Sequence, residues 1–210
     1  MKIVLYGRPY NRTDRVQWTL EELALPYEYR KLDVFGLEHR KPEFRKKYGL
    51  ARLPFVELDG EVMFESGAIM VFLAQRFDAN VDLLLAGDDS AHRQVLQWLF
   101  FAISTLESAQ EHLESGADPA PFAPQIDTLA FLEDRLKGRE YIAAEKFSLA
   151  DIAVANGLKW LNRQSLANFP NASAYFVRQT RRAAYKKITA QPEYPEHAPG
   201  AEPGVRDKRL

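Results

Sequence analysis

Two adjacent residues, Glu65 and Ser66, stand where a predicted strand ends and a predicted helix begins. The first turn of a helix presents free backbone amides and about half a positive charge, so it stabilises a carboxylate. The Ser66 hydroxyl adds a donor, and the Glu65 carboxylate can accept from an ammonium group. This pair predicts a site for a small molecule that carries both charges. The alternative interpretation is an ordinary helix cap.

Cysteine is absent from all 210 residues. Disulfide bonds, thiolate metal ligands and cysteine nucleophiles are therefore excluded. The four histidines, His39, His92, His112 and His197, are never three or four residues apart. Without such spacing a local metal-binding pair is not predicted, and we expect no metal cofactor.

The charges of the chain nearly cancel, with 28 Lys and Arg against 29 Asp and Glu. Nucleic-acid binding needs a basic face, so this balance argues against a nucleic-acid partner. No segment approaches the roughly 20 apolar residues of a membrane span, and the apolar start is too short for a secretory signal. We expect no membrane partner and a cytoplasmic location.

Strand and helix patterns alternate over the first 79 residues. A strand, a helix and a second strand in this order predict a parallel βαβ unit, and Asp59-Gly60 predicts a hairpin between the next two strands. A mixed four-stranded sheet with helices follows from this order. The predicted elements are strands at 2–6, 27–34, 53–58 and 61–64, helices at 12–25 and 65–76, and a charged loop at 35–52.

Helical patterns replace strand patterns in the remainder of the chain. Ser148 and Asp151 form a capping-box sequence before an apolar run, which predicts the start of a helix. Trp18, Trp98 and Trp160 are predicted to lie in the core. The predicted helices are 91–114, 125–137, 148–163 and 172–189, with a loop at 115–124. The predicted domains are 1–79 and 90–190, with a linker at 80–89 and a Pro/Gly-rich tail at 191–210.

Three local motifs resemble the cytosolic glutathione transferase family over residues 1 to about 190. They are Arg52-Leu53-Pro54-Phe55, Glu65-Ser66-Gly67-Ala68-Ile69 and the Ser148/Asp151 capping box. The resemblance implies an α+β fold, with a thioredoxin-like N-terminal domain followed by an all-α C-terminal domain. It also implies a homodimer, glutathione as co-substrate and a second substrate held between the domains.

The same resemblance implies how glutathione is held. Glu65 and Ser66 are expected at its γ-glutamyl end, and a cis Pro54 is expected to expose the Leu53 backbone to its cysteinyl part. Basic residues of the preceding loop are expected near the glycyl carboxylate, although a solvated basic loop is the alternative. These basic residues are His39, Arg40 and Arg52.

The residue that activates the thiol stays open at this point. A free thiol has a pKa near 8.5, so a donor or a positive charge at the sulfur favours the reactive thiolate. The family uses Tyr, Ser or Cys after the first strand, and here both Ser and Cys are missing from 7–13. The candidates that remain are Tyr6, Tyr10, Asn11, Arg12 and Thr13.

The resemblance implies transfer of the glutathione sulfur to small apolar electrophiles. Two alternatives are glutathione-dependent peroxide or disulfide reduction, and a binding or regulatory protein that keeps the fold without efficient catalysis. Aromatic residues near the predicted domain boundary suit an apolar second-substrate pocket, although aromatic residues on a long helix are also typical of a core. The predicted lining is Tyr10, Phe35, Phe100, Phe101 and Ser104.

Overall fold

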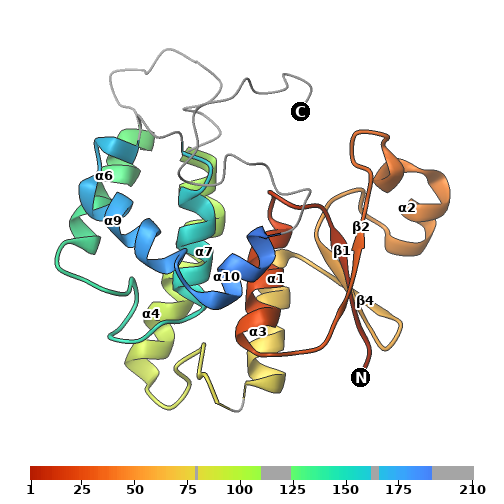
Figure 1. The fold of residues 1–210 in the computed structure, drawn as a ribbon, viewed down its shortest axis with the longest axis horizontal. Helices are drawn as coiled ribbons and strands as arrows, with labels where there is room; N and C mark the ends of the chain where they lie inside the picture. The colour runs from red at the N-terminus through yellow and green to blue at the C-terminus, as the bar shows by residue number, and fades with distance from the viewer. Residues whose placement is uncertain (79, 110–123, 162–165, 191–210) are drawn as a thin grey trace.

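A sheet with helices occupies one half of the molecule, and a group of helices occupies the other (Figure 1). The structure, a computed structural model, describes residues 1–78, 80–109, 124–161 and 166–190. The first half contains β1 (Ile3–Gly7), α1 (Thr13–Glu22), β2 (Glu28–Lys31), η1 (Glu38–Arg40), α2 (Pro42–Tyr48), β3 (Phe55–Leu58), β4 (Glu61–Phe64) and α3 (Ser66–Phe77). The second contains α4 (Asp89–Phe100), η2 (Phe101–Leu106), α6 (Pro124–Leu136), α7 (Leu149–Leu158), α9 (Pro170–Gln179) and α10 (Ala183–Thr189).

The four strands form one mixed sheet in the order β2-β1-β3-β4. β1 and β2 are parallel, whereas β3 is antiparallel to both β1 and β4. Asp59 and Gly60 both have positive φ angles, 50° and 95°, as a tight hairpin turn between twisted strands requires. The predicted parallel pair, hairpin and mixed sheet are confirmed.

The two faces of the sheet are covered differently. Leu5 and Val56 face the main hydrophobic core with α1 and α3, whereas Tyr6 and Phe55 belong to a second, smaller cluster. α2 covers that second cluster with Phe44 and Tyr48. The prediction of a loop over 35–52 is therefore wrong in part. Pro42 starts a helical turn that needs no amide hydrogen bond, and Phe44 and Tyr48, four residues apart, then share the face that packs against the second cluster.

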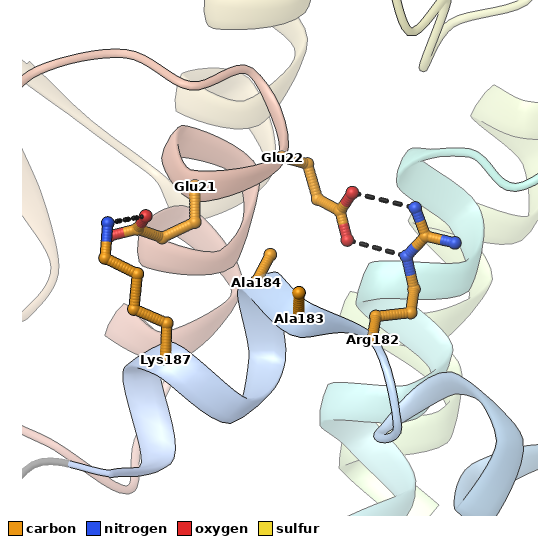
Figure 2. A pocket seen from close by; sticks show the side chains of 6 residues that line it. All are labelled: Glu21, Glu22, Arg182, Ala183, Ala184 and Lys187. Carbon is orange, nitrogen blue, oxygen red and sulfur yellow. Dashed lines mark hydrogen bonds and ion pairs between the residues drawn. The ribbon is translucent and has the colours of Figure 1, made fainter.

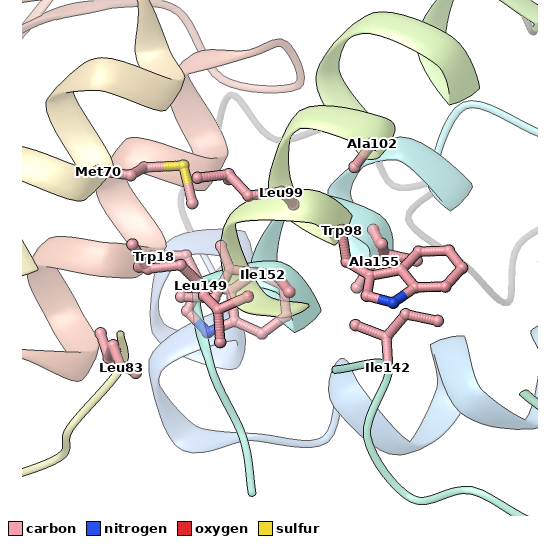
Figure 3. Close-up of a cluster of buried hydrophobic side chains, with 14 of the residues drawn as sticks. Trp18, Met70, Leu83, Trp98, Leu99, Ala102, Ile142, Leu149, Ile152 and Ala155 are labelled. Atoms are coloured by element: carbon pink, nitrogen blue, oxygen red, sulfur yellow. The ribbon is translucent and has the colours of Figure 1, made fainter. Parts of the chain in front are cut away.

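The helical half packs around α7, whose residues are all buried. Trp18 of α1 and Trp98 of α4 lie in this core, as predicted, together with Leu99 and Ile152 (Figure 3). The predicted capping box is present at the start of α7. Packing here is tight, because a Cβ at Gly157 would lie 2.9 Å from the Leu106 side chain.

Two predicted helices are irregular in the structure, and a third ends earlier than its pattern suggested. The helix predicted at 91–114 is α4 followed by the π-helical η2, with 110–114 outside the described residues, and the helix predicted at 172–189 is broken between α9 and α10. α7 ends at Leu158, and Trp160 beyond it is only half-buried. Most of the predicted loop at 115–124 and all of the tail at 191–210 lie outside the described residues. No described helix is long and apolar enough to cross a membrane.

Candidate functional site

The strand register brings three predicted site segments to one end of the sheet. Tyr6 of β1 pairs with Phe55 of β3, and Phe55 pairs with Phe64 of β4. The next residue of each segment is therefore found at the same end of the sheet: Gly7 at the end of β1, Pro54 before β3 and Glu65 after β4. The Leu53–Pro54 peptide bond is cis. We call this end of the sheet the site edge.

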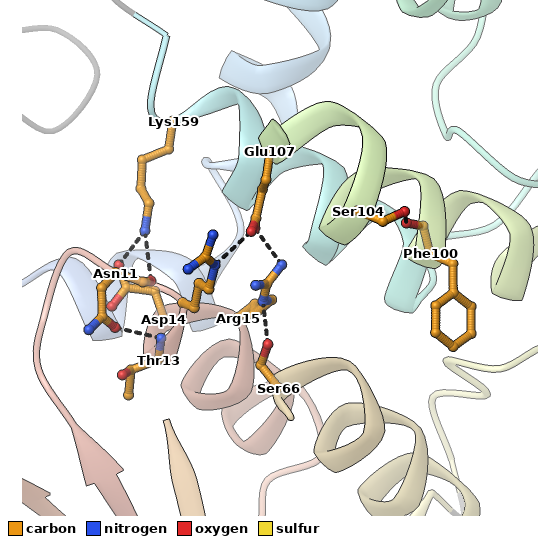
Figure 4. Close-up of polar contacts among 10 residues, drawn as sticks. Asn11, Thr13, Asp14, Arg15, Ser66, Phe100, Ser104, Glu107 and Lys159 are labelled. Atoms are coloured by element: carbon orange, nitrogen blue, oxygen red, sulfur yellow. Dashed lines mark hydrogen bonds and ion pairs between the residues drawn. The ribbon is translucent and has the colours of Figure 1, made fainter. Parts of the chain in front are cut away.

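Ser66 is the first residue of α3, and Arg15 holds its side chain in place. The Arg15 Nε donates to the Ser66 Oγ at 2.9 Å, and both side chains are buried (Figure 4). Because the oxygen already accepts this bond, the hydroxyl proton of Ser66 is available for a second group. A hydroxyl that donates at a helix N-terminus is suited to a carboxylate.

A carboxylate from the helical half holds that arginine. Glu107 follows η2, and its Oε1 accepts from Arg15 at 2.6 Å while its Oε2 accepts from Arg12 at 2.7 Å. Burial lowers the pKa of Arg15, and the negative charge of Glu107 opposes that shift. The two halves of the molecule are thus joined by charge next to Ser66.

A second buried ion pair fixes the loop between β1 and α1. Lys159, just after α7, donates to Asp14 Oδ2 at 2.6 Å and to the carbonyl oxygen of Asn11 at 3.3 Å. Asp14 Oδ1 in turn accepts from the backbone amide of Tyr10, which has a φ of 59°. Figure 4 shows Lys159, Asn11 and Asp14 pointing toward one another across the two halves.

Two of the five candidate thiol activators, Tyr6 and Thr13, have side chains that pack against other protein groups. The Tyr6 ring packs on the opposite sheet face, stacked on Phe55, and its hydroxyl accepts from Arg30 at 3.1 Å. Burial, and then the Tyr48 hydroxyl, raise the pKa of Tyr6. Thr13 is fully buried, with its side chain pressed against Gly7. We therefore revise the candidate set to the loop residues.

The remaining three candidates differ in what their polar atoms already contact. The Tyr10 hydroxyl donates to the Lys159 carbonyl at 3.4 Å, and Arg12 pairs with Glu107. Asn11 uses its Oδ1 to accept from the Thr13 amide at 2.6 Å. That bond orients the side-chain amide and leaves Nδ2, among the described residues, without a protein acceptor. Among these three candidates, Asn11 is thus the one whose side-chain amide N–H is available to a ligand.

The basic residues expected at the glycyl carboxylate fall into two kinds. His39 is buried on η1, and burial followed by the charge of Arg40 lowers its pKa. Arg40 and Arg52 are exposed. The two arginines are therefore the better partners for a carboxylate, because the burial of His39 disfavours a charged ring.

The predicted second-substrate residues do not gather in one place. The Tyr10 ring meets Trp160 edge-on at 4.9 Å, and Phe35 is 59% exposed. Phe101 instead packs against Trp98 and Phe131 in the helical half, so we remove it from the pocket. Phe100 and Ser104 are exposed, and Figure 4 shows them on their helix apart from the charged cluster.

Sequence reasoning missed the charged residues that position the site. Arg8, Asp14, Arg15, Glu107 and Lys159 stand at or beside buried positions, and the last four form ion pairs between the two halves of the molecule. One signal was present in the sequence: residues 12–15 carry three charges at the start of the first predicted helix. Partners 92 and 145 residues away gave no local pattern that could identify them.

A separate cavity of about 510 Å³ lies between α1 and α10 (Figure 2). Its charged groups are already paired, Glu22 with Arg182 and Glu21 with Lys187. None of the predicted site residues lines it. Within the described residues there is also no group of three or more potential metal ligands.

Comparison with protein families gives two matches along the chain. Residues 5–81 match the glutathione S-transferase N-terminal domain, and residues 126–183 match the glutathione S-transferase C-terminal domain. Together they cover both halves of the fold.

Relatives of two kinds are similar in sequence to this chain. Glutathione S-transferase hmp2 of Hypomyces subiculosus is 28% identical over 211 residues, which cover 91% of this chain and 99% of that protein. Elongation factor 1-gamma of Danio rerio is 29% identical over 176 residues, which cover 75% of this chain. The matched region spans only 38% of that longer relative.

Solved structures share the fold. Glutathione transferase F7 from Populus trichocarpa has a TM-score of 0.75 at 24% identity, covering 90% of this chain and 98% of that one. Glutathione transferase URE2P6 from Phanerochaete chrysosporium, solved in complex with oxidized glutathione, has a TM-score of 0.75 at 23% identity, covering 90% and 95%.

Proposed function

Because the chain belongs to the glutathione S-transferase family, we propose that it binds glutathione at the site edge and transfers the glutathione sulfur to small apolar electrophiles. The observation that carries this proposal is the convergence of the cis Leu53–Pro54 bond, Glu65 and the Arg15-held Ser66. Together they offer a backbone edge, a carboxylate and an anion site to one zwitterionic peptide.

In this proposal each part of glutathione meets a matching group. The γ-glutamyl carboxylate accepts from the Ser66 hydroxyl and the first amides of α3, and the ammonium group lies against Glu65. The Leu53 backbone pairs with the cysteinyl part as an added strand would. Exposed Arg40 and Arg52 attract the glycyl carboxylate.

The Asn11 side-chain amide is our proposed thiol activator. It donates Nδ2–H to the sulfur, which lowers the thiol pKa and lets the proton leave to solvent. The thiolate then attacks an electrophilic carbon, a carbon–sulfur bond forms, and the leaving group departs with its bonding electrons. Arg12 adds positive charge at the same loop, and its ion pair with Glu107 partly offsets that charge.

Replacing Ser66 with alanine is expected to weaken glutathione binding about 10- to 100-fold, because a hydrogen bond to a charged group contributes about 1.5–3 kcal/mol. Isothermal titration with glutathione measures this. Ser90→Ala, an exposed serine at the start of α4, is the matched control and should bind like the wild type. Equal affinities for the two variants would remove Ser66 from the site.

Replacing Asn11 with aspartate keeps the oxygen that accepts from the Thr13 amide and replaces the Nδ2 donor with a negative oxygen. We expect the glutathione thiol pKa in the complex to rise, and kcat with a generic aryl halide to fall about 100-fold. The thiolate absorbance as a function of pH reports the pKa directly. Tyr6→Phe is expected to change neither value, and a large loss in Tyr6→Phe would restore Tyr6 as the activator.

We also propose that the protein is a homodimer. Phe64, Phe72 and Phe100 are exposed on β4, α3 and α4, and aromatic residues are enriched at protein interfaces. Light scattering after size exclusion should give twice the mass of one chain. Phe72→Asp together with Phe100→Asp should give a monomer, and an unchanged dimer would place the interface elsewhere.

A second candidate function is glutathione binding without efficient catalysis. It is favoured by the absence of serine and cysteine at residues 7–13 and by the relatives named elongation factor 1-gamma. Tight glutathione binding with a thiol pKa that stays near 8.5 in the complex would favour it over the transferase. Peroxide or disulfide reduction is a third possibility, in which every reacting sulfur would come from glutathione or the substrate.

A further inference from the structure

Arg8, the residue directly after β1, is a half-buried cation at the site edge. Its guanidinium carbon lies 4.8 Å from the centre of the Phe35 ring, and its Nε donates weakly to the Pro9 carbonyl at 3.4 Å. Within the described part of the chain, no carboxylate forms an ion pair with it. Burial lowers the pKa of Arg8, and the charges of Asp14 and then Tyr29 oppose that shift. A partly desolvated cation of this kind favours an incoming anion.

The neighbouring charges are already balanced by protein partners. Asp14 is held by Lys159, and Glu107 is shared by Arg12 and Arg15. Among the described residues, neither carboxylate forms an ion pair with Arg8, since Asp14 pairs with Lys159 and Glu107 with Arg12 and Arg15. The positive charge of Arg8 is therefore the one in this loop that a ligand can neutralise without breaking an existing pair.

The order of the strands separates Arg8 from the groups proposed to hold glutathione. The groups proposed to hold glutathione belong to the β3 and β4 side of β1, at Pro54, Glu65 and Ser66. Arg8 leans instead toward Phe35, which follows β2 on the other side of β1. Arg8 and Phe35 thus lie on the side of β1 that the groups proposed to hold glutathione leave unused.

An exposed aromatic ring lies against Arg8. Phe35 exposes most of its ring, and on the side of the helical half the rings of Tyr10 and Trp160 meet edge-on. Rings of this kind bind planar apolar groups by stacking. The exposed Phe35 ring and the Arg8 guanidinium carbon, 4.8 Å apart, thus offer a planar surface and a cation side by side.

We propose that the preferred second substrate is a planar aromatic or conjugated electrophile that carries a carboxylate, with the carboxylate on Arg8 and the plane against Phe35. This inference rests on the proposed transferase function. In the reaction the glutathione thiolate forms a carbon–sulfur bond at the ring, and a leaving group such as chloride departs with the bonding electrons. The carboxylate takes no part in bond changes, so Arg8 is a specificity residue.

The test compares 4-chloro-3,5-dinitrobenzoate with its neutral carboxamide, which has the same ring and leaving group. We expect kcat/KM, divided by the uncatalysed rate constant of each substrate with glutathione, to be higher for the carboxylate in the wild-type protein, because the carboxamide activates the ring more strongly. Arg8→Gln should lower kcat/KM about tenfold or more for the carboxylate and less than about threefold for the carboxamide. Arg8→Lys should recover part of the preference. Arg93→Gln, an exposed arginine on α4, is the control and should leave the ratio unchanged.

Two results would overturn the inference. If the ratio of kcat/KM for the carboxylate to that for the carboxamide is unchanged in Arg8→Gln, Arg8 does not recognise the charge of the substrate. An equal loss for both substrates, with weaker glutathione binding or a raised thiol pKa, would mean that Arg8 serves glutathione itself.

A binding measurement separates this inference from the proposed function. The glutathione conjugates of both substrates are titrated into wild-type and Arg8→Gln protein, which needs no turnover. Absence of glutathione binding would sink the proposed function. Normal glutathione binding with equal affinity for the two conjugates would sink only the inference.

Discussion

Replacing Asp151 with alanine is expected to lower the free energy of unfolding by about 4 kcal/mol, because it leaves several buried donors without an acceptor. Oδ1 accepts from the Ile142 amide at 2.9 Å and from the Tyr175 hydroxyl at 2.7 Å. Oδ2 accepts from the Ser148 amide at 2.9 Å and from the Ser148 hydroxyl at 3.1 Å. One carboxylate thus ties the start of α7 to α9 and to the segment before α7.

Denaturant unfolding followed by circular dichroism measures this loss. Asp134→Ala is the matched control, because that side chain is exposed on α6, and surface substitutions usually change stability by less than about 0.5 kcal/mol. A loss in Asp151→Ala no larger than in the control would contradict the role assigned to the capping box.

The pH dependence of the Asp151 contribution has a defined sign. Burial raises the pKa of Asp151 to about 6, against about 3.9 in an unfolded chain. Between these values the folded state binds more protons than the unfolded state, so the stability contributed by this group falls as the pH rises from about 4 to 6. Asp151→Asn cannot titrate, and its stability deficit relative to wild type should shrink over that range.

Replacing Lys159 with methionine is expected to cost about 3–5 kcal/mol, because it removes the cation from a buried ion pair. The Lys159 side chain is 0% exposed and that of Asp14 is 1% exposed. Burial lowers the pKa of Lys159, and the charge of Asp14 opposes the shift. The methionine variant leaves the Asp14 carboxylate buried without that countercharge, beside the loop that carries Asn11.

A double substitution tests whether the pair itself is responsible. Lys159→Met combined with Asp14→Leu removes both charges and should recover most of the lost stability. Lys187→Met is the control, since it also breaks a lysine pair with α1, but its side chain is 71% exposed and the loss should stay below about 1 kcal/mol. A double variant as unstable as Lys159→Met would assign the loss to packing instead.

The sequence by itself determined the features that depend on near neighbours. The Asp59-Gly60 hairpin needs two adjacent residues with positive φ, and the Ser148/Asp151 capping box needs two residues three apart, so both were predicted and both are present. The α+β order and the family follow from such short motifs as well. The Glu65-Ser66 strand-to-helix junction was predicted for the same reason.

Only the tertiary structure decided which chemical groups are available at the site. Leu5 and Tyr6 are neighbours in one strand and both are buried, and the packing of α2 determines that Tyr6 faces away from α1 and α3. Arg15 reaches Ser66 across 51 residues, and Lys159 reaches Asp14 across 145. Such partners meet because two independently patterned halves pack together, and hydrophobic periodicity carries no information about which buried charges will then lie opposite one another.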